Sequence, residues 1–231
     1  MKCSNDTHDL NLFKLLHIVS PTLPVGAFSY SQTLEWWVEQ GVVKDESSFI
    51  KWLSDFLLLG QFRSDLVFFN QAFTSIKTND FNHFLEINSL YLSSRETSEL
   101  RLESIQMGYS LLKLIPEITS LDLKLFPFDN KELGYPLVWV LLSYYCGLNN
   151  VTAQKGFLWS WLENIVMVGV KVIPLGQTAG QRILVKMIEI LDLNLEKMIS
   201  INNEDIPITT LPGLAIASSC HETQYTRLFR S

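Results

Sequence analysis

"PLVWVLLSYYCGLNNVTAQKGFLWSWLENIVMVGVK", which runs from Pro136 to Lys171, is the stretch that decides the fold. It holds two strongly apolar runs, at about 136–147 and 151–171, on either side of the turn-forming sequence "GLNN". In each run the apolar residues go nearly all the way round a helix, which is typical of buried helices. The stretch therefore predicts two helices in the core of the protein.

The segments outward from this stretch also have the helical period. Asp45 can cap a helix whose apolar residues form one stripe, and Pro116 is expected to end another helix. No alternation of strands with helices, no repeat and no low-complexity run occurs. The further helices are expected near residues 29–40, from 45 toward 73, at 80–92, at 94–115, at 174–199 and at 211–223. The chain is thus expected to be all-α, a single-domain multi-helix bundle of roughly eight to ten helices over residues 1–231.

Composition and charge exclude several classes of protein. The chain of 231 residues carries a net charge of −6, whereas a nucleic-acid-binding protein normally has a basic face. Cys3, Cys146 and Cys220 lie far apart without a CxxC pair, which fits a reducing compartment. The longest charge-free run, Gly134 to Gln154, contains a proline and several polar residues, so no membrane span is expected. Because the N-terminus also lacks the apolar core of a signal peptide, a cytoplasmic location is expected.

The sequence shows no spacing typical of a catalytic or metal site. It has no G-x-x-x-x-G-K-[ST] phosphate-binding motif, and its four histidines include no pair at i, i+4. Cys220 and His221 are adjacent, so on a helix they point in different directions. We therefore predict no catalytic residue, no dedicated metal site and no cofactor. Two alternatives stay open: a histidine that shares a metal across a dimer, and an all-α enzyme whose pocket contains a histidine.

A second stretch, "SPTLPVGAFSYSQTLEWWVEQG" (Ser20–Gly41), sets prolines and a glycine before an aromatic segment. The prolines restrict φ, and Gly26 permits an unusual φ. Ser29 and Gln32 have capping-box spacing, which predicts a helix from this point. The stretch is interpreted as a shaped surface rather than a catalytic site.

The last eleven residues, "HETQYTRLFRS", form an aromatic and arginine-rich tail (221–231). Terminal segments without a role tend to be polar, whereas aromatic and arginine side chains are typical anchors of interfaces. The tail is expected either to pack on its own core or to bind a partner.

Three further features have both a structural and a functional interpretation. Arg95 and Glu99 have i, i+4 spacing, which indicates a solvated ion pair or a charged rim for a partner. Gly176 and Gly180 have the spacing of close helix packing. Lys171 follows an apolar run, so its ammonium is expected to extend to water or to serve a function.

Four segments in order resemble the UreF family of urease accessory proteins. They are "SPTLPVGAFSYSQTLEW", "RETSELRLESIQMG", "VKVIPLGQTAGQRIL" and "HETQYTRLFRS", and they span most of the chain. The family usually has Gly where this chain has Thr33, which is tolerable if that position is helical. Residues 122–133 match no segment of the family pattern.

The resemblance implies an all-α, non-enzymatic protein that forms a homodimer and binds the accessory protein UreD, also called UreH. That complex would recruit the GTPase UreG and help deliver nickel to apo-urease. The resemblance also implies that the tail becomes ordered on binding UreD, that Arg227 matters for complex formation, and that Lys171 is tied to nickel-dependent activation.

We hypothesise that Pro24 to Tyr30 forms a partner-facing surface together with the tail. Residues 1–9 are expected to be flexible. The alternative function is a metallochaperone that binds nickel with its own His and Cys ligands. The candidate partner-binding residues are Pro24, Phe28, Tyr30, Lys171, Gln177, His221, Tyr225, Arg227, Phe229 and Arg230.

Overall fold

The structure is a computed structural model that describes residues 5–128, 131–199 and 211–231. Within these ranges it contains ten α-helices, two short 3-10 helices and no strand, which confirms the all-α prediction. The α-helices are α1 (Asn5–Ile18), α2 (Leu34–Glu39), α3 (Glu46–Leu59), α4 (Gln61–Lys77), α5 (Phe81–Ser93), α6 (Ser98–Ile118), α7 (Tyr135–Tyr145), α8 (Asn150–Val172), α9 (Gln177–Ile199) and α10 (Pro212–Glu222). The 3-10 helices are η1 (Ala27–Ser29) and η2 (Leu123–Leu125).

The helices α7 and α8 lie at the centre, as their all-round apolar sequences predict. Seven consecutive α7 residues, Pro136 to Leu142, are buried, and the ring of Trp139 lies 5.8 Å from that of Phe157 on α8. The Trp139 indole N–H donates to the carbonyl of Ala153 at 3.2 Å, so its one polar atom is paired inside the core. The two predicted runs therefore form the layer against which other helices pack.

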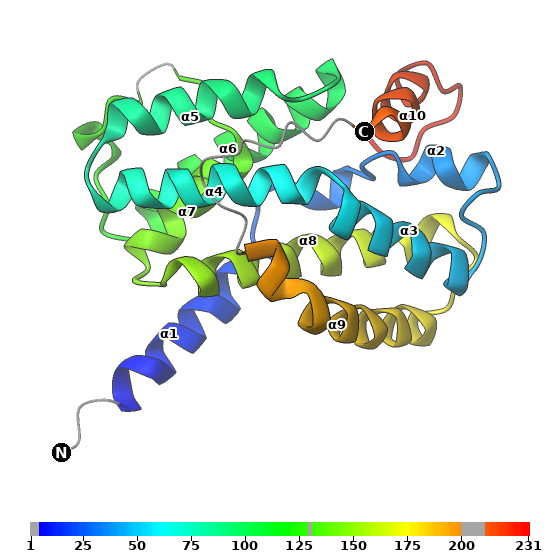
Figure 1. The fold of residues 1–231 in the computed structure, drawn as a ribbon, viewed down its shortest axis with the longest axis horizontal. Helices are drawn as coiled ribbons and strands as arrows, with labels where there is room; N and C mark the ends of the chain where they lie inside the picture. The colour runs from blue at the N-terminus through cyan, green and yellow to red at the C-terminus, as the bar shows by residue number, and fades with distance from the viewer. Residues whose placement is uncertain (1–4, 129–130, 200–210) are drawn as a thin grey trace.

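Several of the remaining helices pack directly on this layer (Figure 1). The α7 helix packs against α4 and α6, and α8 packs against α9, which also contacts α3. The α1 helix projects from the body at its N-terminal end, while α10 lies beside α2 at the opposite end (Figure 1). Residues 1–4 and the side chains of residues 5–9 lie outside the described part, so flexibility of residues 1–9 and the single-domain boundary stay predictions.

Two predicted helix ends are wrong. The helix capped by Asp45 does not run on toward residue 73, because the chain changes direction at Gly60 and begins α4. Pro116 does not end α6, because it lies in the last turn, and the helix continues to Ile118. The cap at Asp45 itself is confirmed, since its carboxylate accepts from the backbone N–H of Ser48 at 2.8 Å.

The predicted helix start at Ser29 is also wrong. Ser29 ends η1, and α2 begins only at Leu34. Gly26 has a φ of 79°, as the turn was expected to need, but Thr33 is not helical and has a φ of 71°. Its side chain is fully buried, and its hydroxyl has no hydrogen-bond partner. A β-branched residue in this left-handed region is strained, which explains why glycine suits the position.

Replacing Thr33 with Gly should therefore stabilise the protein by about 1 kcal/mol, because the strain and the unpaired hydroxyl are both removed. Thr33→Ala is the matched control, since it removes the hydroxyl and retains the Cβ that causes the strain. Urea unfolding followed by circular dichroism measures the difference. A Thr33→Gly protein no more stable than Thr33→Ala contradicts the assignment of strain to this residue.

The predicted Arg95–Glu99 ion pair is wrong as well. Arg95 precedes α6 and turns inward, where its guanidinium lies 3.0 Å from the carboxylate of Asp65 on α4 and 4.4 Å from the ring centroid of Tyr91 on α5. Burial raises the pKa of Asp65, and the charge of Arg95 opposes that rise. A buried pair of this kind joins α4, α5 and the start of α6, and it leaves Glu99 free to serve another contact.

Candidate partner-binding surface

The C-terminal tail (221–231) is held against the body by α10 and the first turns of α2 and α6. The Ser218 hydroxyl of α10 lies 2.7 Å from that of Thr97, and Ser98 donates to the Glu222 carboxylate at 2.7 Å. The chain then turns back, and its end lies between α10 and the rest of the bundle (Figure 1). These contacts bring the last residues over the segment 29–35.

A single carboxylate fixes the backbone of the tail. Glu35, in the first turn of α2, is buried, and its two oxygens accept from the consecutive N–H groups of Leu228 at 2.7 Å and Phe229 at 3.1 Å. The Phe229 side chain is buried in the main core. Hydrogen bonds from two amides to an ionised group are among the stronger ones in proteins, so Glu35 sets the path of this segment.

The side chain of His221 contacts two acids of the body, Glu35 and Glu99. Its imidazole is fully buried, with Nδ1 at 3.1 Å from Glu99 Oε2 and Nε2 at 3.5 Å from Glu35 Oε2. Arg227 donates both to the Glu99 carboxylate and to the backbone carbonyl of Arg230. Two side chains of the tail region, His221 and Arg227, thus meet two carboxylates of the body.

The final residues close over the loop before α2. The backbone carbonyl of Ser231 accepts from the N–H of Ser31 at 2.6 Å and from its hydroxyl at 2.5 Å. The N–H of Arg230 donates to the carbonyl of Ser29 at 2.9 Å. These bonds place the tail directly beside η1, and the shared partner-facing surface stays a prediction.

Below the tail lies a third acid, Glu103 of α6. Its carboxylate accepts from the Ser231 hydroxyl at 2.5 Å and from the Gln32 amide at 2.8 Å, and Gln32 in turn accepts from the Trp161 indole at 2.5 Å. Burial raises the pKa of Glu103 to about 7, and the hydrogen bonds from Ser231 and Gln32 oppose the rise. We call Glu35, Glu99 and Glu103 the carboxylate cluster.

An internal cavity of about 60 Å³ adjoins the inner end of this cluster. Glu103 and Asp65 both line it, together with the hydroxyl-bearing Tyr30 and apolar groups such as Phe62. The Tyr30 hydroxyl donates to the Gln106 side chain at 2.7 Å. The cavity has room for a few water molecules beside the polar side chains that line it, Glu103 among them.

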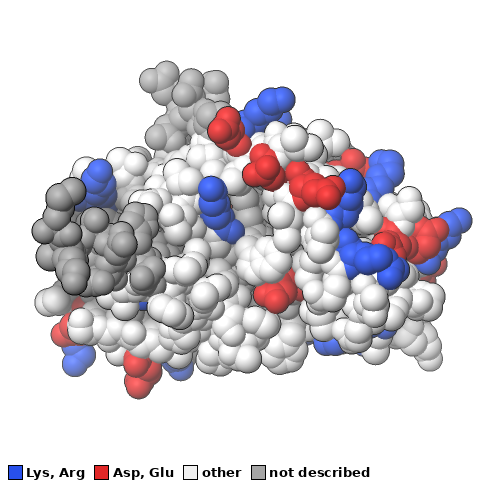
Figure 2. Space-filling view, turned by 90° about the horizontal axis from the view of Figure 1, so that it is seen from below, with Lys and Arg blue, Asp and Glu red and all other residues white. Residues whose placement is uncertain are grey.

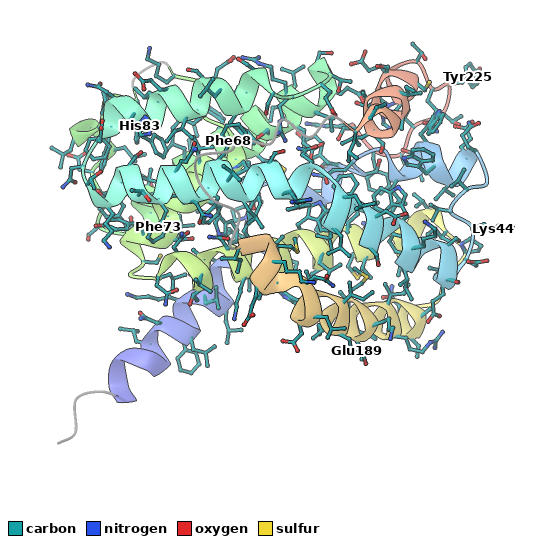
Figure 3. The ribbon with its side chains drawn as sticks, viewed as in Figure 1. Lys44, Phe68, Phe73, His83, Glu189 and Tyr225 are labelled. Carbon is teal, nitrogen blue, oxygen red and sulfur yellow. The ribbon has the colours of Figure 1, made fainter. Side chains whose placement is uncertain are left out.

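The outer face of the same region exposes several large apolar side chains among polar ones. The Tyr225 side chain is fully exposed, and Leu228, Phe28 and Ile216 are more than half exposed. Figure 3 shows Tyr225 beyond the end of α10, with nothing of the bundle outside it. Because the Arg230–Ser29 hydrogen bond sets η1 beside the tail, Phe28 belongs to the same region of surface. Exposed apolar groups gathered in this way are typical of a docking surface.

The structure separates the candidate residues into two groups. Tyr30, His221, Arg227, Phe229 and Arg230 meet around the carboxylate cluster, with Phe28 in the adjoining η1 and Tyr225 at the outer edge, while Pro24 is exposed in the loop before η1.

Lys171 and Gln177 are exposed at the junction of α8 and α9, outside the tail contacts described above. Gly180, close to this junction, approaches Val170 of α8 so closely that an added Cβ would lie 2.9 Å from its methyl group, as expected for close helix packing.

Sequence reasoning missed the carboxylate cluster. Glu99 is interpreted from the sequence as part of a solvated ion pair or a charged rim, and the sequence gives no prediction for Glu35 or Glu103. The sequence does contain an indication of a buried acid. Glu35 lies within the aromatic segment "LEWWV", where an acid that faces the core needs a hydrogen-bond donor. Its donors come from residues nearly 200 positions later, which no local pattern indicates.

Neither a metal site nor a membrane helix is found in the part of the chain that the structure describes. No group of three or more His, Cys, Asp and Glu residues within residues 5–128, 131–199 and 211–231 could hold a metal ion. Among the same residues, no helix combines the length and apolar character needed to cross a bilayer. On the face seen from below, acidic and basic side chains lie interspersed toward the α3–α9 end and form no region of one sign (Figure 2).

Known proteins are similar in sequence to this chain over nearly its full length. A family model described as UreF matches residues 43–188. The "Urease accessory protein UreF" of Azoarcus sp. (strain BH72) is 40% identical, and the match covers 96% of each chain. The protein of the same name from Nitrosococcus oceani is 39% identical, with 96% of this chain and 99% of the relative covered. That from Dechloromonas aromatica is 37% identical, with 96% and 98% covered.

These relatives match nearly the full length of the chain, and their names place them in a class of accessory proteins rather than a class of enzymes. The chain belongs to the UreF family of urease accessory proteins. This membership supports a role in urease maturation.

Replacing Glu35 with Gln should release the tail. The new amide NH₂ would face a backbone N–H, so at least one of the two amide bonds is lost, at a cost of about 1–3 kcal/mol. Trypsin cleavage after Arg227, measured by mass spectrometry, should accelerate on the order of tenfold or more. Glu39→Gln, an exposed acid on the same helix, is the control and should cleave like the parent. Equal cleavage rates in both variants would show that Glu35 does not hold the tail.

Proposed function

We propose that this protein is a non-enzymatic scaffold for nickel insertion into apo-urease. In this role it binds the accessory protein UreD (also called UreH), and the complex recruits and regulates the GTPase UreG. The observation that carries the proposal is the tail, whose inner side is anchored to the body and whose outer side presents large apolar groups. Family membership supports the link to urease, and the tail supplies a surface suited to a partner.

The side chains of the tail fall into a buried set and an exposed set. His221, Phe229 and Ser231 are buried, whereas Tyr225 and Leu228 point outward. Aromatic and apolar side chains at the centre of an interface contribute most of its affinity. Because the buried side already fixes the backbone, a partner that meets the docked tail avoids part of the cost of ordering it.

Several candidate residues then act by holding the tail in its docked conformation rather than by contacting a partner. Tyr30 is buried and bonded to Gln106, and His221 is enclosed by Glu35 and Glu99. Arg227 is about one quarter exposed and bonded to Glu99, so its loss would free the tail as well as remove a charge from the surface. Substitution of these residues would therefore affect complex formation by changing the conformation of the tail.

Lys171 and Gln177 provide a second point of contact in this proposal. Both are exposed at the α8–α9 junction, separate from the carboxylate cluster. A scaffold that holds UreD and UreG together needs more than one surface, and this junction is our candidate for the one not formed by the tail.

The proposal also includes a homodimer within the complex and a cytoplasmic location. Cys146 and Cys220 are free thiols, which fits a reducing compartment. Nickel is cargo of the complex here, and no ligand set in this chain is assigned to it.

Replacing both Tyr225 and Leu228 with Ala should weaken binding of UreD/UreH by on the order of tenfold or more, because two exposed anchors are removed without any buried contact. Co-purification of tagged UreD/UreH and surface plasmon resonance measure the effect. Leu193→Ala on α9 is the control, since that leucine is as exposed as Leu228. Undiminished binding by the double variant would remove the tail from the proposed interface.

A further inference from the structure

The outer face of α6 carries an apolar stripe that is open to solvent. Leu102 and Tyr109 are 50% and 58% exposed, and Ile105 and Leu112 are partly buried beside them. The four residues have the spacing i, i+3, i+7 and i+10, so they lie on one side of the helix. Ten residues of an α-helix extend about 15 Å, or nearly three turns. The stripe is therefore long enough to receive one short helix of another chain.

The stripe adjoins a groove of about 510 Å³, which we call the α6 groove. One side of the groove is the stripe, and the opposite side is the segment 131–133 that precedes α7. This second wall is fixed to α6 at two points. The Arg101 guanidinium lies 2.8 Å from the Glu132 carboxylate, and a Cβ added to Gly108 would lie only 2.2 Å from the carbonyl oxygen of Leu133. The walls of the groove are thus held in place by the helical body.

The docked tail supplies another part of the lining, Arg230. The backbone N–H of Arg230 donates to the Ser29 carbonyl at 2.9 Å, and its side chain faces the Tyr30 hydroxyl. That hydroxyl donates to Gln106, which also lines the groove. The α6 groove is therefore complete only when the tail is docked.

Cations surround the apolar stripe. The Lys113 ammonium lies 4.4 Å from the ring centroid of Tyr109, and Lys131 and Arg230 line the groove itself. In the part of the chain that the structure describes, no ion pair joins a carboxylate to any of these three cations. The carboxylate of Glu132 on the wall is already paired. The groove thus has a positive rim on a chain whose net charge is −6.

This combination favours one kind of partner. Apolar side chains on a partner helix can cover the stripe, while carboxylates beside them can pair with the rim, which the acidic chain itself leaves without counterions. A membrane surface suits the shape less well, because an amphipathic helix lies flat in the bilayer interface and the wall at 131–133 stands beside the stripe. The charge and the concave shape together indicate a protein segment.

We propose that the α6 groove binds an acidic amphipathic helix of a partner protein, and that docking of the tail completes this site. The proposal rests on the proposed function, because UreD/UreH is taken as the partner that supplies the helix. The groove and the exposed side chains of the tail then form two parts of one interface, with Arg230 common to both.

The lysines of the rim provide the first test. Replacing Lys113 and Lys131 together with Glu should weaken binding of UreD/UreH at least about tenfold, mainly through slower association, because the rim then repels the acidic helix. The affinity of the parent protein should also fall with added salt more steeply than that of this variant. Surface plasmon resonance measures both effects. Lys186→Glu on α9, which lies on the other side of the bundle in Figure 1, is the control and should bind like the parent protein.

The apolar stripe provides the second test. Tyr109→Ser should weaken binding by about tenfold through faster dissociation, because it removes a large exposed anchor from the groove. Leu193→Ser on α9 is the matched control, since it removes another exposed apolar group. Circular dichroism verifies that each variant keeps its helical body, and the lysine variant alone decides the matter if Tyr109→Ser fails to fold.

The result for the groove is separable from the result for the proposed function. If both groove variants bind UreD/UreH like the parent protein while the Tyr225 and Leu228 double variant loses binding, the groove proposal is overturned and the scaffold stands. If the tail variant also binds undiminished, the proposed tail interface fails as well.

Two other occupants have their own readouts. Sedimentation with phosphatidylserine vesicles that the lysine variant abolishes, with UreD/UreH binding unchanged, assigns the groove to a lipid surface and overturns the proposal. A change in the molar mass of isolated Tyr109→Ser by light scattering, again with unchanged binding, assigns it to a second copy of this chain and overturns the proposal too.

Discussion

The carboxylate of Glu35 accepts hydrogen bonds from two consecutive amides of the tail, and the arrangement of the C-terminal region depends on this contact. A buried carboxylate without donors would be strongly unfavourable, so the body of the protein requires a partner at this position. The tail supplies two N–H groups and the edge of the His221 imidazole. Phe229 then enters the core, Ser231 reaches Ser31 and Glu103, and Tyr225 is left outside. The hydrogen bonds of the buried Glu35 carboxylate thus determine which side chains of the tail are exposed to solvent.

The helical body contributes rigidity to this arrangement. The α7–α8 layer fixes α4 and α6, and the buried Arg95–Asp65 pair holds the start of α6 against α4. Glu99 and Glu103 lie on that part of α6, where they contact the tail. A preformed receptor lowers the entropic cost of closing a long-range contact. Two of the same acids, Glu35 and Glu99, meet His221 and Arg227 of the tail region, so the acids of the body and the donors of the tail are matched in position.

The sequence was sufficient for the main helices because their apolar patterns are local. The runs at 136–147 and 151–171 correspond to α7 and α8 within two residues, and the cap at Asp45 has the expected geometry. It was insufficient where distant residues decide the conformation. Thr33 takes a left-handed φ that a helical pattern does not predict, and Arg95 turns inward to Asp65 instead of pairing with Glu99. The tail was recognised as a candidate from its composition, but its anchor Glu35 could not be, since the partners are separated by 193 and 194 positions.

The central claim is that an internally anchored tail forms the surface by which this UreF-family protein joins its complex. Isothermal titration of UreD/UreH into the parent protein, Glu35→Gln and Glu39→Gln tests it most directly. The account predicts affinity at least about tenfold weaker for Glu35→Gln alone, because that variant must order its tail on binding. Equal affinity for all three proteins, with the tail of Glu35→Gln shown by proteolysis to be released, would contradict the account.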